Sequence, residues 1–189
     1  MLALLVGAAS AASAGQTVAS RPTAPYDVRF MTNMIDHHAM AVQMAQVCQR
    51  RAVHGQLRGL CVTISASQQR EIRQMRTWLR AWYRTDHAPM MMPGMGQQMR
   101  RLGQFSGRMF EIHFMNMMIP HHQEAVRDAR TCVNRADHRE LRQLCRNIIR
   151  TQTAEIRQMR GWLCAWYAQC GQENRQHRRG PGGPGGPGA

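Results

Sequence analysis

The sequence contains one unit twice. Residues 27–83 align with residues 111–167 at a constant offset of 84 without a gap, and 30 of the 57 aligned positions are identical. The motif "EIRQMR" occurs in both units, and "WLRAWY" in the first unit corresponds to "WLCAWY" in the second. A repeat of this length is typical of a supersecondary unit that completes its core by packing against its copy.

Each unit has the apolar periodicity of two helices. Apolar side chains recur every three or four residues over 27–48 and again over 57–83, and the alternation typical of strands is absent. Two helices with one apolar stripe each cannot bury both stripes alone. We therefore predict an all-α fold, a ferritin-like four-helix bundle built from two duplicated helical hairpins at 27–83 and 111–167.

The segments outside the repeats differ in composition. Residues 1–14 are apolar, too short to span a bilayer, and end in a small-x-small motif, which predicts a cleaved signal peptide; an uncleaved anchor is the alternative. Residues 84–107 form a Met-rich linker with a predicted short helix near 97–104. Residues 171–189 are rich in Gly and Pro and are predicted to be disordered. We expect a periplasmic or secreted protein without stable membrane insertion after signal cleavage.

The chain is strongly basic, with a formal net charge of +14 that includes 25 arginines and no lysine. Basic proteins often bind nucleic acid. Here the arginines are scattered over both units, and no nucleic-acid-binding motif is present. We therefore predict no nucleic-acid partner.

Six cysteines fit an oxidising compartment. Two pairs occupy equivalent positions in the repeats, each pair is 13 residues apart, and each would join the end of one helix to the start of the next. No C-x-x-C motif is present. The predicted disulfides are Cys48–Cys61, Cys132–Cys145 and, near the end of the last helix, Cys164–Cys170.

These bridges predict which side chains are neighbours within each hairpin. A disulfide brings two Cα atoms within about 6 Å, and a helix rises about 1.5 Å per residue. Counting ten residues from each bridge predicts a polar layer of His38, Glu71, His122 and Glu155. Counting fourteen residues predicts an adjacent layer of four thioethers, Met34, Met75, Met118 and Met159. His37 points about 100° away from His38, toward an edge that carries Met40 and Met44.

The composition of these layers indicates a metal site. A buried carboxylate needs a partner, such as a histidine, Gln68 or Gln152, an arginine or a metal. Methionine at helical spacing is often core filler, but imidazole and thioether together suit Cu(I). The candidate ligands are His37, His38, His121, His122, Met34, Met40, Met44, Met75, Met118 and Met159, with Glu71 and Glu155 orienting the histidines and Met90, Met91, Met92, Met95 and Met99 in the linker.

Other chemistries of helical bundles lack their motifs. A di-iron centre needs Glu-x-x-His on two helices, and no glutamate here is followed by histidine at that spacing. Covalent c-type haem needs C-x-x-C-H, which is also absent, although non-covalent haem stays open. We predict a protein that is not an enzyme, with metal-dependent redox activity as an alternative.

The paired motifs "MTNMIDHHAMA" and "MNMMIPHHQEA", with "AEIRQMRGWL" downstream, resemble the domain of unknown function 305 family over residues 27–167. The resemblance implies a ferritin-like four-helix fold and export. Some members, the CopM-like periplasmic proteins, are linked to copper binding and resistance. By motif, the implied metal-binding residues are Met34, His37, His38, Met118, His121 and His122. The two repeats differ beside these motifs, where Met40 and Met44 of the first repeat correspond to Glu124 and Asp128 of the second.

The sequence therefore predicts an exported protein that binds copper, most simply Cu(I), for sequestration or carriage. Its expected partners are the metal ion and other periplasmic copper-handling proteins. The alternative is a periplasmic interaction or stress protein, chaperone-like and without metal.

Overall fold

The fold is given by a computed structural model that describes residues 25–90 and 94–171. The predicted signal peptide at 1–14 lies outside the described residues, as do Met91, Met92 and the predicted tail after Gly171.

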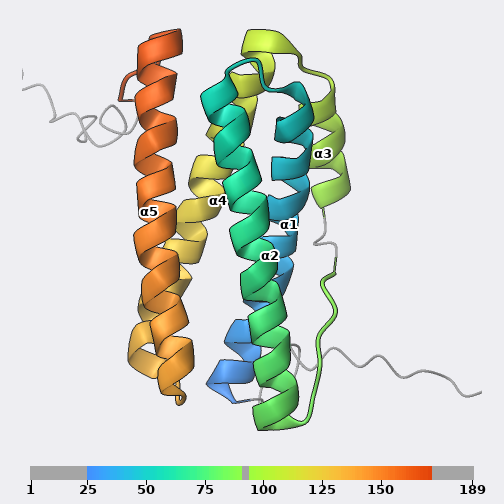
Figure 1. Ribbon diagram of the computed structural model, residues 1–189, viewed down its shortest axis with the longest axis vertical. Coiled ribbons are helices and arrows are strands. Elements are labelled where there is room, and N and C mark those ends of the chain that lie inside the picture. Colours follow the sequence, from blue (N-terminus) through green and yellow to red (C-terminus); the bar gives the residue numbers. More distant parts are fainter. Residues whose placement is uncertain (1–24, 91–93, 172–189) are drawn as a thin grey trace, which may run out of the picture.

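The described residues form five helices and no strand, so the predicted all-α bundle of two duplicated hairpins is confirmed (Figure 1). The linker helix follows the Pro- and Gly-containing segment, as the sequence predicts. The helices are α1 (Tyr26–Arg51), α2 (Gly55–Tyr83), α3 (Met95–Gly103), α4 (Gly107–Arg135) and α5 (Arg139–Tyr167).

The two hairpins meet through their first helices. α1 packs along α2, α4 packs along α5, and α1 contacts α4 between them. The short α3 lies against α1 and α4 on one side of the bundle (Figure 1). The first turn of α1 lies at the turn between α4 and α5, where Asp27 binds Asp137 and His138. α1 and α4 therefore run antiparallel, and the repeats are related by an approximate two-fold axis across the bundle.

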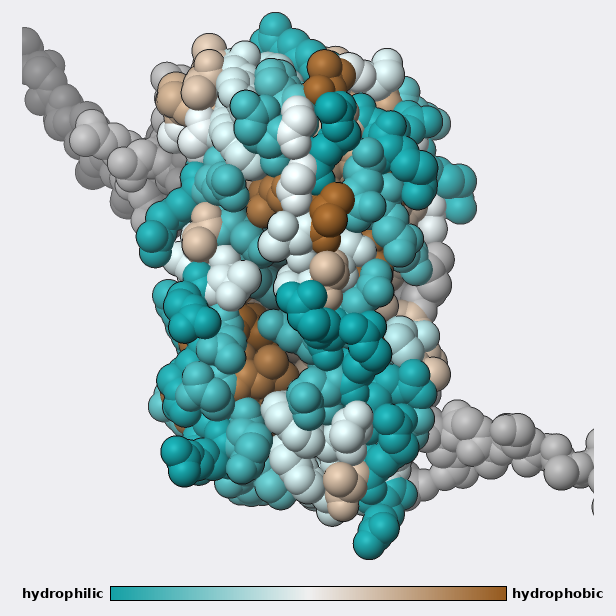
Figure 2. Space-filling model, viewed as in Figure 1, coloured by the Kyte–Doolittle hydropathy of each residue, from teal (hydrophilic) through white to brown (hydrophobic). Residues whose placement is uncertain are grey.

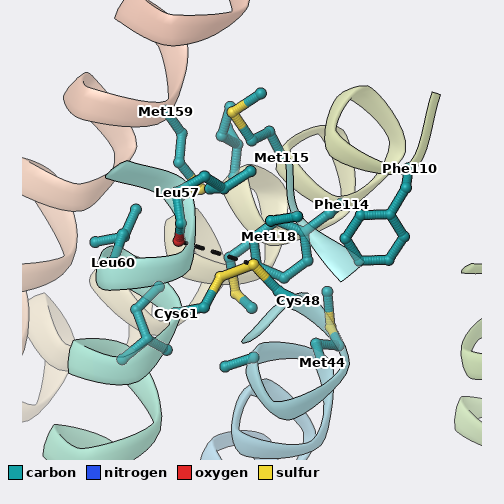
Figure 3. Close-up of a cluster of buried hydrophobic side chains, with 14 of the residues drawn as sticks. Met44, Cys48, Leu57, Leu60, Cys61, Phe110, Phe114, Met115, Met118 and Met159 are labelled. Carbon is teal, nitrogen blue, oxygen red and sulfur yellow. Dashed lines mark hydrogen bonds between the residues drawn. A yellow bond between two sulfur atoms is a disulfide. The ribbon is translucent and has the colours of Figure 1, made fainter. Parts of the chain in front are cut away.

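Each hairpin is closed by a disulfide at its turn. The Cα atoms of Cys48 and Cys61 are 6.1 Å apart, and those of Cys132 and Cys145 are 6.2 Å apart. Figure 3 shows the first bridge inside the apolar core, with Met118 and Met159 of the other hairpin nearby. The third bridge, Cys164–Cys170, ties the residues after α5 back to its last turn.

Removing a hairpin bridge should cost much of the protein's stability. Closing a loop of this length restricts the unfolded chain and contributes about 3 kcal/mol. We expect Cys132→Ala with Cys145→Ala to lower the free energy of unfolding in urea by about that amount. The same change at Cys164 and Cys170, which close a shorter loop, should cost less; equal losses from the two pairs would contradict the loop-entropy explanation.

The second helix of each hairpin is capped by the other hairpin. Glu111 of α4, which is fully buried, accepts hydrogen bonds from the backbone N–H groups of Val53 (2.6 Å) and His54 (2.7 Å) at the start of α2. It also contacts Nδ1 of His54 (2.6 Å) and the hydroxyl of Tyr167. The bond to His54 satisfies a donor that the start of α2 leaves open, and the bond to Val53 fixes the chain just before the helix.

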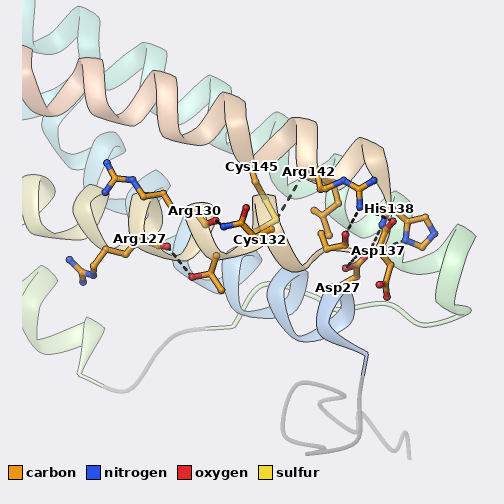
Figure 4. The surroundings of a disulfide bond; sticks show 12 residues. Asp27, Arg127, Arg130, Cys132, Asp137, His138, Arg142 and Cys145 are labelled. Carbon is orange, nitrogen blue, oxygen red and sulfur yellow. Dashed lines mark hydrogen bonds and ion pairs between the residues drawn. A yellow bond between two sulfur atoms is a disulfide. The ribbon is translucent and has the colours of Figure 1, made fainter.

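The repeat-related cap has the same geometry. Asp27 of α1, also fully buried, accepts from the backbone N–H groups of Asp137 (2.9 Å) and His138 (3.2 Å) and from Nδ1 of His138 (2.9 Å) (Figure 4). Asp27 and Glu111 are 84 residues apart, which is the repeat offset. Two buried carboxylates therefore connect the hairpins at opposite ends of the bundle.

Among the described residues, no helix combines the length and the apolar character that a membrane span requires.

Candidate metal centre

Two histidine–glutamate pairs form the polar layer that the disulfide spacing predicts. His38 Nε2 lies 2.6 Å from Glu71 Oε2, and His122 Nε2 lies 2.8 Å from Glu155 Oε2. The contact between His38 and Glu71 has hydrogen-bond geometry. The distance between His122 and Glu155 is also short, but the angle of that contact is not that of a hydrogen bond. Both imidazoles are fully buried, and the predicted heights within each hairpin are correct.

The two glutamates differ in exposure. The side chain of Glu71 is 19% exposed and that of Glu155 is 7% exposed.

Because an ionised carboxylate can only accept hydrogen bonds, the paired nitrogen of His38 must be the one that carries the proton. In neutral His38 this leaves the Nδ1 lone pair for another partner.

The other two histidines of the paired motifs lie between these pairs. The rings of His37 and His121 stack across the α1–α4 contact, with centroids 3.7 Å apart and planes 30° apart. His37 is 8% exposed and His121 is 7% exposed. The sequence predicts that His37 points toward the edge that carries Met40 and Met44, but the antiparallel crossing of α1 and α4 buries it against α4.

Burial keeps this stacked pair uncharged. Loss of hydration is the main cause that lowers the pKa of His37 to about 3, with smaller contributions from His38 and His122. The pKa of His121 is likewise well below its ordinary value, mainly through burial. Neutral imidazole is the form that binds a metal, so both rings are in a ligand-competent state at neutral pH.

The centre contains many polar atoms without a hydrogen-bond partner among the described residues. Buried polar groups are normally paired. The atoms are both ring nitrogens of His37, His121 and His122, Nδ1 of His38, the side-chain amide of Gln68 and Oε1 of Gln152. Each unpaired group costs about 1–3 kcal/mol. A cluster of this kind on one layer is a poor structural network and a suitable set of ligands.

Replacing the stacked pair by His37→Phe with His121→Phe should stabilise the metal-free protein. Phenylalanine keeps the stacked rings and removes four unpaired nitrogens, so we expect a gain in urea unfolding at pH 7.5 of at least about 1–3 kcal/mol, the cost of a single unpaired group. A loss of stability would show that the histidines hold the fold together.

The pH dependence of stability tests the same histidines independently of packing. Below about pH 6.5 the unfolded chain binds protons at these histidines and the folded chain does not. The wild type should therefore lose about 1.4 kcal/mol per pH unit for each of them as pH falls. For His37 this loss ends near pH 3. The double phenylalanine variant should have a correspondingly shallower slope; an unchanged slope would contradict the low pKa values.

The four methionines next to the polar layer do not form a single layer. Met34 and Met75 pack in one apolar cluster, and Met118 and Met159 pack in the other. The sequence prediction of one methionine layer was wrong because α1 and α4 run antiparallel. Met34 and Met118 each lie one turn before a central histidine, so they lie on opposite sides of the polar layer. The polar layer has one thioether pair on each side.

The structure also separates His37 from Met40 and Met44. His37 lines a pocket with Asp128 and Glu124, whose Oε2 is 4.0 Å from His37 Nε2. Met40 and Met44 line a different pocket, beneath α3. Of the described linker methionines, Met95 is buried, Met99 is partly buried against the core and Met90 is 45% exposed.

Within the residues that the structure describes, no three His, Cys, Asp or Glu side chains are grouped as a set of metal ligands. The apolar side chains beside the histidines include thioethers, with Met34 and Met75 in one cluster and Met118 and Met159 in the other. A mixed set of imidazole and thioether is one that soft Cu(I) prefers.

Two features of the structure were not predicted from the sequence. The capping carboxylates Asp27 and Glu111 sit at equivalent positions in the repeats, and an acid in the apolar stripe at both positions is a signal that could have revealed them. His113 and Met117 line the pocket with Met40 and Met44. The other repeat has Arg29 and Asn33 at the equivalent positions, so the duplicated motif did not single them out.

The chain belongs to the family described as Domain of unknown function (DUF305), whose model matches residues 27–163 and 111–184. No curated protein matches the sequence.

Several solved structures share this fold. CopM in its Cu(I)-bound form is 34% identical, with 75% of this chain and 97% of that chain covered and a TM-score of 0.67. CopM has also been solved in Cu(II)-bound and Ag-bound forms. A candidate secreted DUF305 protein from Streptomyces coelicolor is 29% identical (74% and 93% covered, TM-score 0.67). A DUF305 fragment from Deinococcus radiodurans is 30% identical (76% and 98% covered, TM-score 0.65).

Proposed function

We propose that this protein binds Cu(I) in the centre of the bundle and sequesters or carries it outside the cytoplasm. The observation that carries the proposal is the environment of His38 and His122. Each imidazole is fully buried, has Nε2 against a glutamate and has an Nδ1 without a hydrogen-bond partner among the described residues. A carboxylate that orients a histidine through one nitrogen while the other binds metal is a common arrangement in metal sites.

The arrangement favours two repeat-related sites over one shared centre. In the first hairpin, His38 would bind through Nδ1 with the thioethers of Met34 and Met75. In the second hairpin, the equivalent ligands are His122, Met118 and Met159. One imidazole and two thioethers form a neutral, soft ligand set, which stabilises Cu(I) over Cu(II). His37 and His121 lie between the two sites and offer additional neutral nitrogens.

A surface groove gives the first site a route to solvent. The groove has a volume of about 580 Å³ and is lined by α2, including Glu71 and Trp78, and by the first turns of α5, including Leu144. Figure 2 shows a hollow between α5 and α2 with apolar surface inside it. Glu71 both lines this groove and contacts His38. An ion in the groove would therefore be separated from the buried His38 by the side chain of Glu71.

The comparisons support the choice of metal. CopM, with which this chain shares the fold over nearly all of the CopM length, has been solved with Cu(I), Cu(II) and Ag. The three disulfides leave no free cysteine in the described chain, so thiolate does not compete with the proposed ligands. Disulfides also fit a periplasmic or extracellular protein.

The test is anaerobic competition for Cu(I) between the disulfide-intact protein and a chromogenic Cu(I) chelator, with elemental analysis of the bound metal. We expect tight binding of at least two equivalents, with Cu(II) bound more weakly. Failure to take Cu(I) from the chelator at any stoichiometry would contradict the proposal. The chaperone-like alternative predicts suppression of aggregation of an unfolded client in the presence of chelator, which copper binding alone does not.

A further inference from the structure

A separate pocket of about 430 Å³ lies between α1, α3 and α4. Four of its lining side chains carry soft or borderline donor atoms: Met40 and Met44 from α1, and His113 and Met117 from α4. The two residues on each helix are four positions apart, so they lie on the same face one turn from each other. The pocket therefore has two donors from each of two neighbouring helices.

These side chains are held within the protein. Met44 is fully buried, and Met40 and Met117 are partly buried against the apolar core. The ring of His113 stacks on Phe105, with centroids 3.7 Å apart and planes 13° apart. This contact fixes the ring plane and leaves its in-plane nitrogens for other partners.

The repeat provides an internal comparison. A related pocket of about 550 Å³ lies between α1 and α4 on the equivalent surface. It has Arg29, Asn33, Glu124 and Asp128 at the positions of His113, Met117, Met40 and Met44. One repeat-related pocket is therefore soft and largely neutral, and the other is charged.

Packing alone does not explain the soft pocket. α3 covers it through Leu102, with Gln98 and the exposed Arg101 at its edge, and this cover accounts for apolar side chains beneath it. Branched or aromatic side chains would fill such a contact with better-defined rotamers than methionine. The combination of three thioethers and one imidazole around a remaining cavity is instead a donor set for Cu(I) or Ag(I).

We infer that Met40, Met44, His113 and Met117 form an additional site for a soft monovalent metal ion, separate from the bundle centre. The inference deepens the proposed function and shares its premise that the protein handles Cu(I). The charged related pocket does not form such a site, so the full chain binds one more ion than the two central sites provide.

The experiment uses the full, disulfide-intact chain labelled with [¹³C-methyl]methionine and titrated with silver nitrate, because Ag(I) mimics Cu(I) without redox chemistry. Methyl resonances assigned by single Met→Leu variants report each thioether. We expect a third bound equivalent of Ag(I) by elemental analysis, with shifts at Met40, Met44 and Met117. His113→Phe with Met117→Leu keeps the contact with Phe105 and the apolar volume, and it should lose that one equivalent.

The control variant Met109→Leu removes an exposed thioether of α4 that is outside the pocket, and it should leave all three equivalents in place. Unmoved Met40 and Met117 resonances at several-fold excess of Ag(I) would overturn the inference, as would an unchanged stoichiometry in the double variant. Shifts in the pocket with no response at Met34 and Met118 would sustain this inference and reject the proposed central sites.

Discussion

Replacing His38 and His122 together by glutamine is expected to weaken Cu(I) binding at the bundle centre by more than about 100-fold. Loss of a residue that merely orients a ligand costs about 10–100-fold in metal affinity, so loss of the ligand itself should cost more. Glutamine keeps a side-chain N–H for Glu71 and Glu155 and removes the imidazole. Anaerobic competition against a Cu(I) chelator measures the effect.

The matched control is His54→Gln with His138→Gln. These histidines are also repeat-related and paired with carboxylates, at 2.6 Å from Glu111 and 2.9 Å from Asp27, but they lie at the ends of the bundle. The control should lose stability and keep its Cu(I) affinity. Equal losses of affinity in the two double variants would mean that copper binding depends on general integrity of the fold, and the central ligands would be wrong.

The largest effect on stability is expected at the two capping carboxylates. Changing Glu111 to Ala should lower the free energy of unfolding by about 3–5 kcal/mol, because it leaves two backbone N–H groups before α2, the partly exposed ring of His54 and the hydroxyl of Tyr167 without their charged partner. Asp27→Ala should have a similar effect at the other end. Urea unfolding followed by circular dichroism at pH 7.5 provides the measurement.

Asp86→Ala is the comparison for this prediction. Asp86 pairs with Arg76 and Arg80, but its side chain is 39% exposed, so the pair should contribute less than about 1 kcal/mol. If Glu111→Ala and Asp86→Ala cost the same, the buried caps do not couple the hairpins.

The Glu111 cap should also be sensitive to acid. Burial alone would raise the pKa of Glu111, but hydrogen bonds from Tyr167 and from the backbone and ring of His54 lower it overall. A carboxyl group with a lowered pKa stabilises the fold above its unfolded pKa, and this contribution is lost as pH falls through the folded pKa. The effect has the same sign as that of His37 and His121, so acidification destabilises the metal-free protein through both.

The sequence predicts well what lies within one hairpin. A disulfide fixes the height of two helices covalently, and counting from Cys48–Cys61 leads correctly to the contact between His38 and Glu71. The periodicity of each unit likewise predicts the helices, because an apolar stripe defines both the element and its buried face.

Relations between the hairpins were harder to predict because no covalent bond fixes them. The antiparallel crossing of α1 and α4 divides the methionines into Met34 with Met75 and Met118 with Met159, where counting along the chain predicted one layer. The same crossing buries His37 against His121. The separation of the methionines and the burial of His37 depend on how the two hairpins pack against each other. The apolar pattern within one hairpin does not determine that packing.

The most direct test of the account is a crystal structure of the Cu(I)-loaded protein with anomalous scattering measured at the copper edge. Copper is expected within bonding distance of Nδ1 of His38 and His122, each with thioether sulfur from the same hairpin and with Glu71 and Glu155 still at Nε2. Copper bound elsewhere, with the Nδ1 atoms of His38 and His122 still without metal, would contradict it.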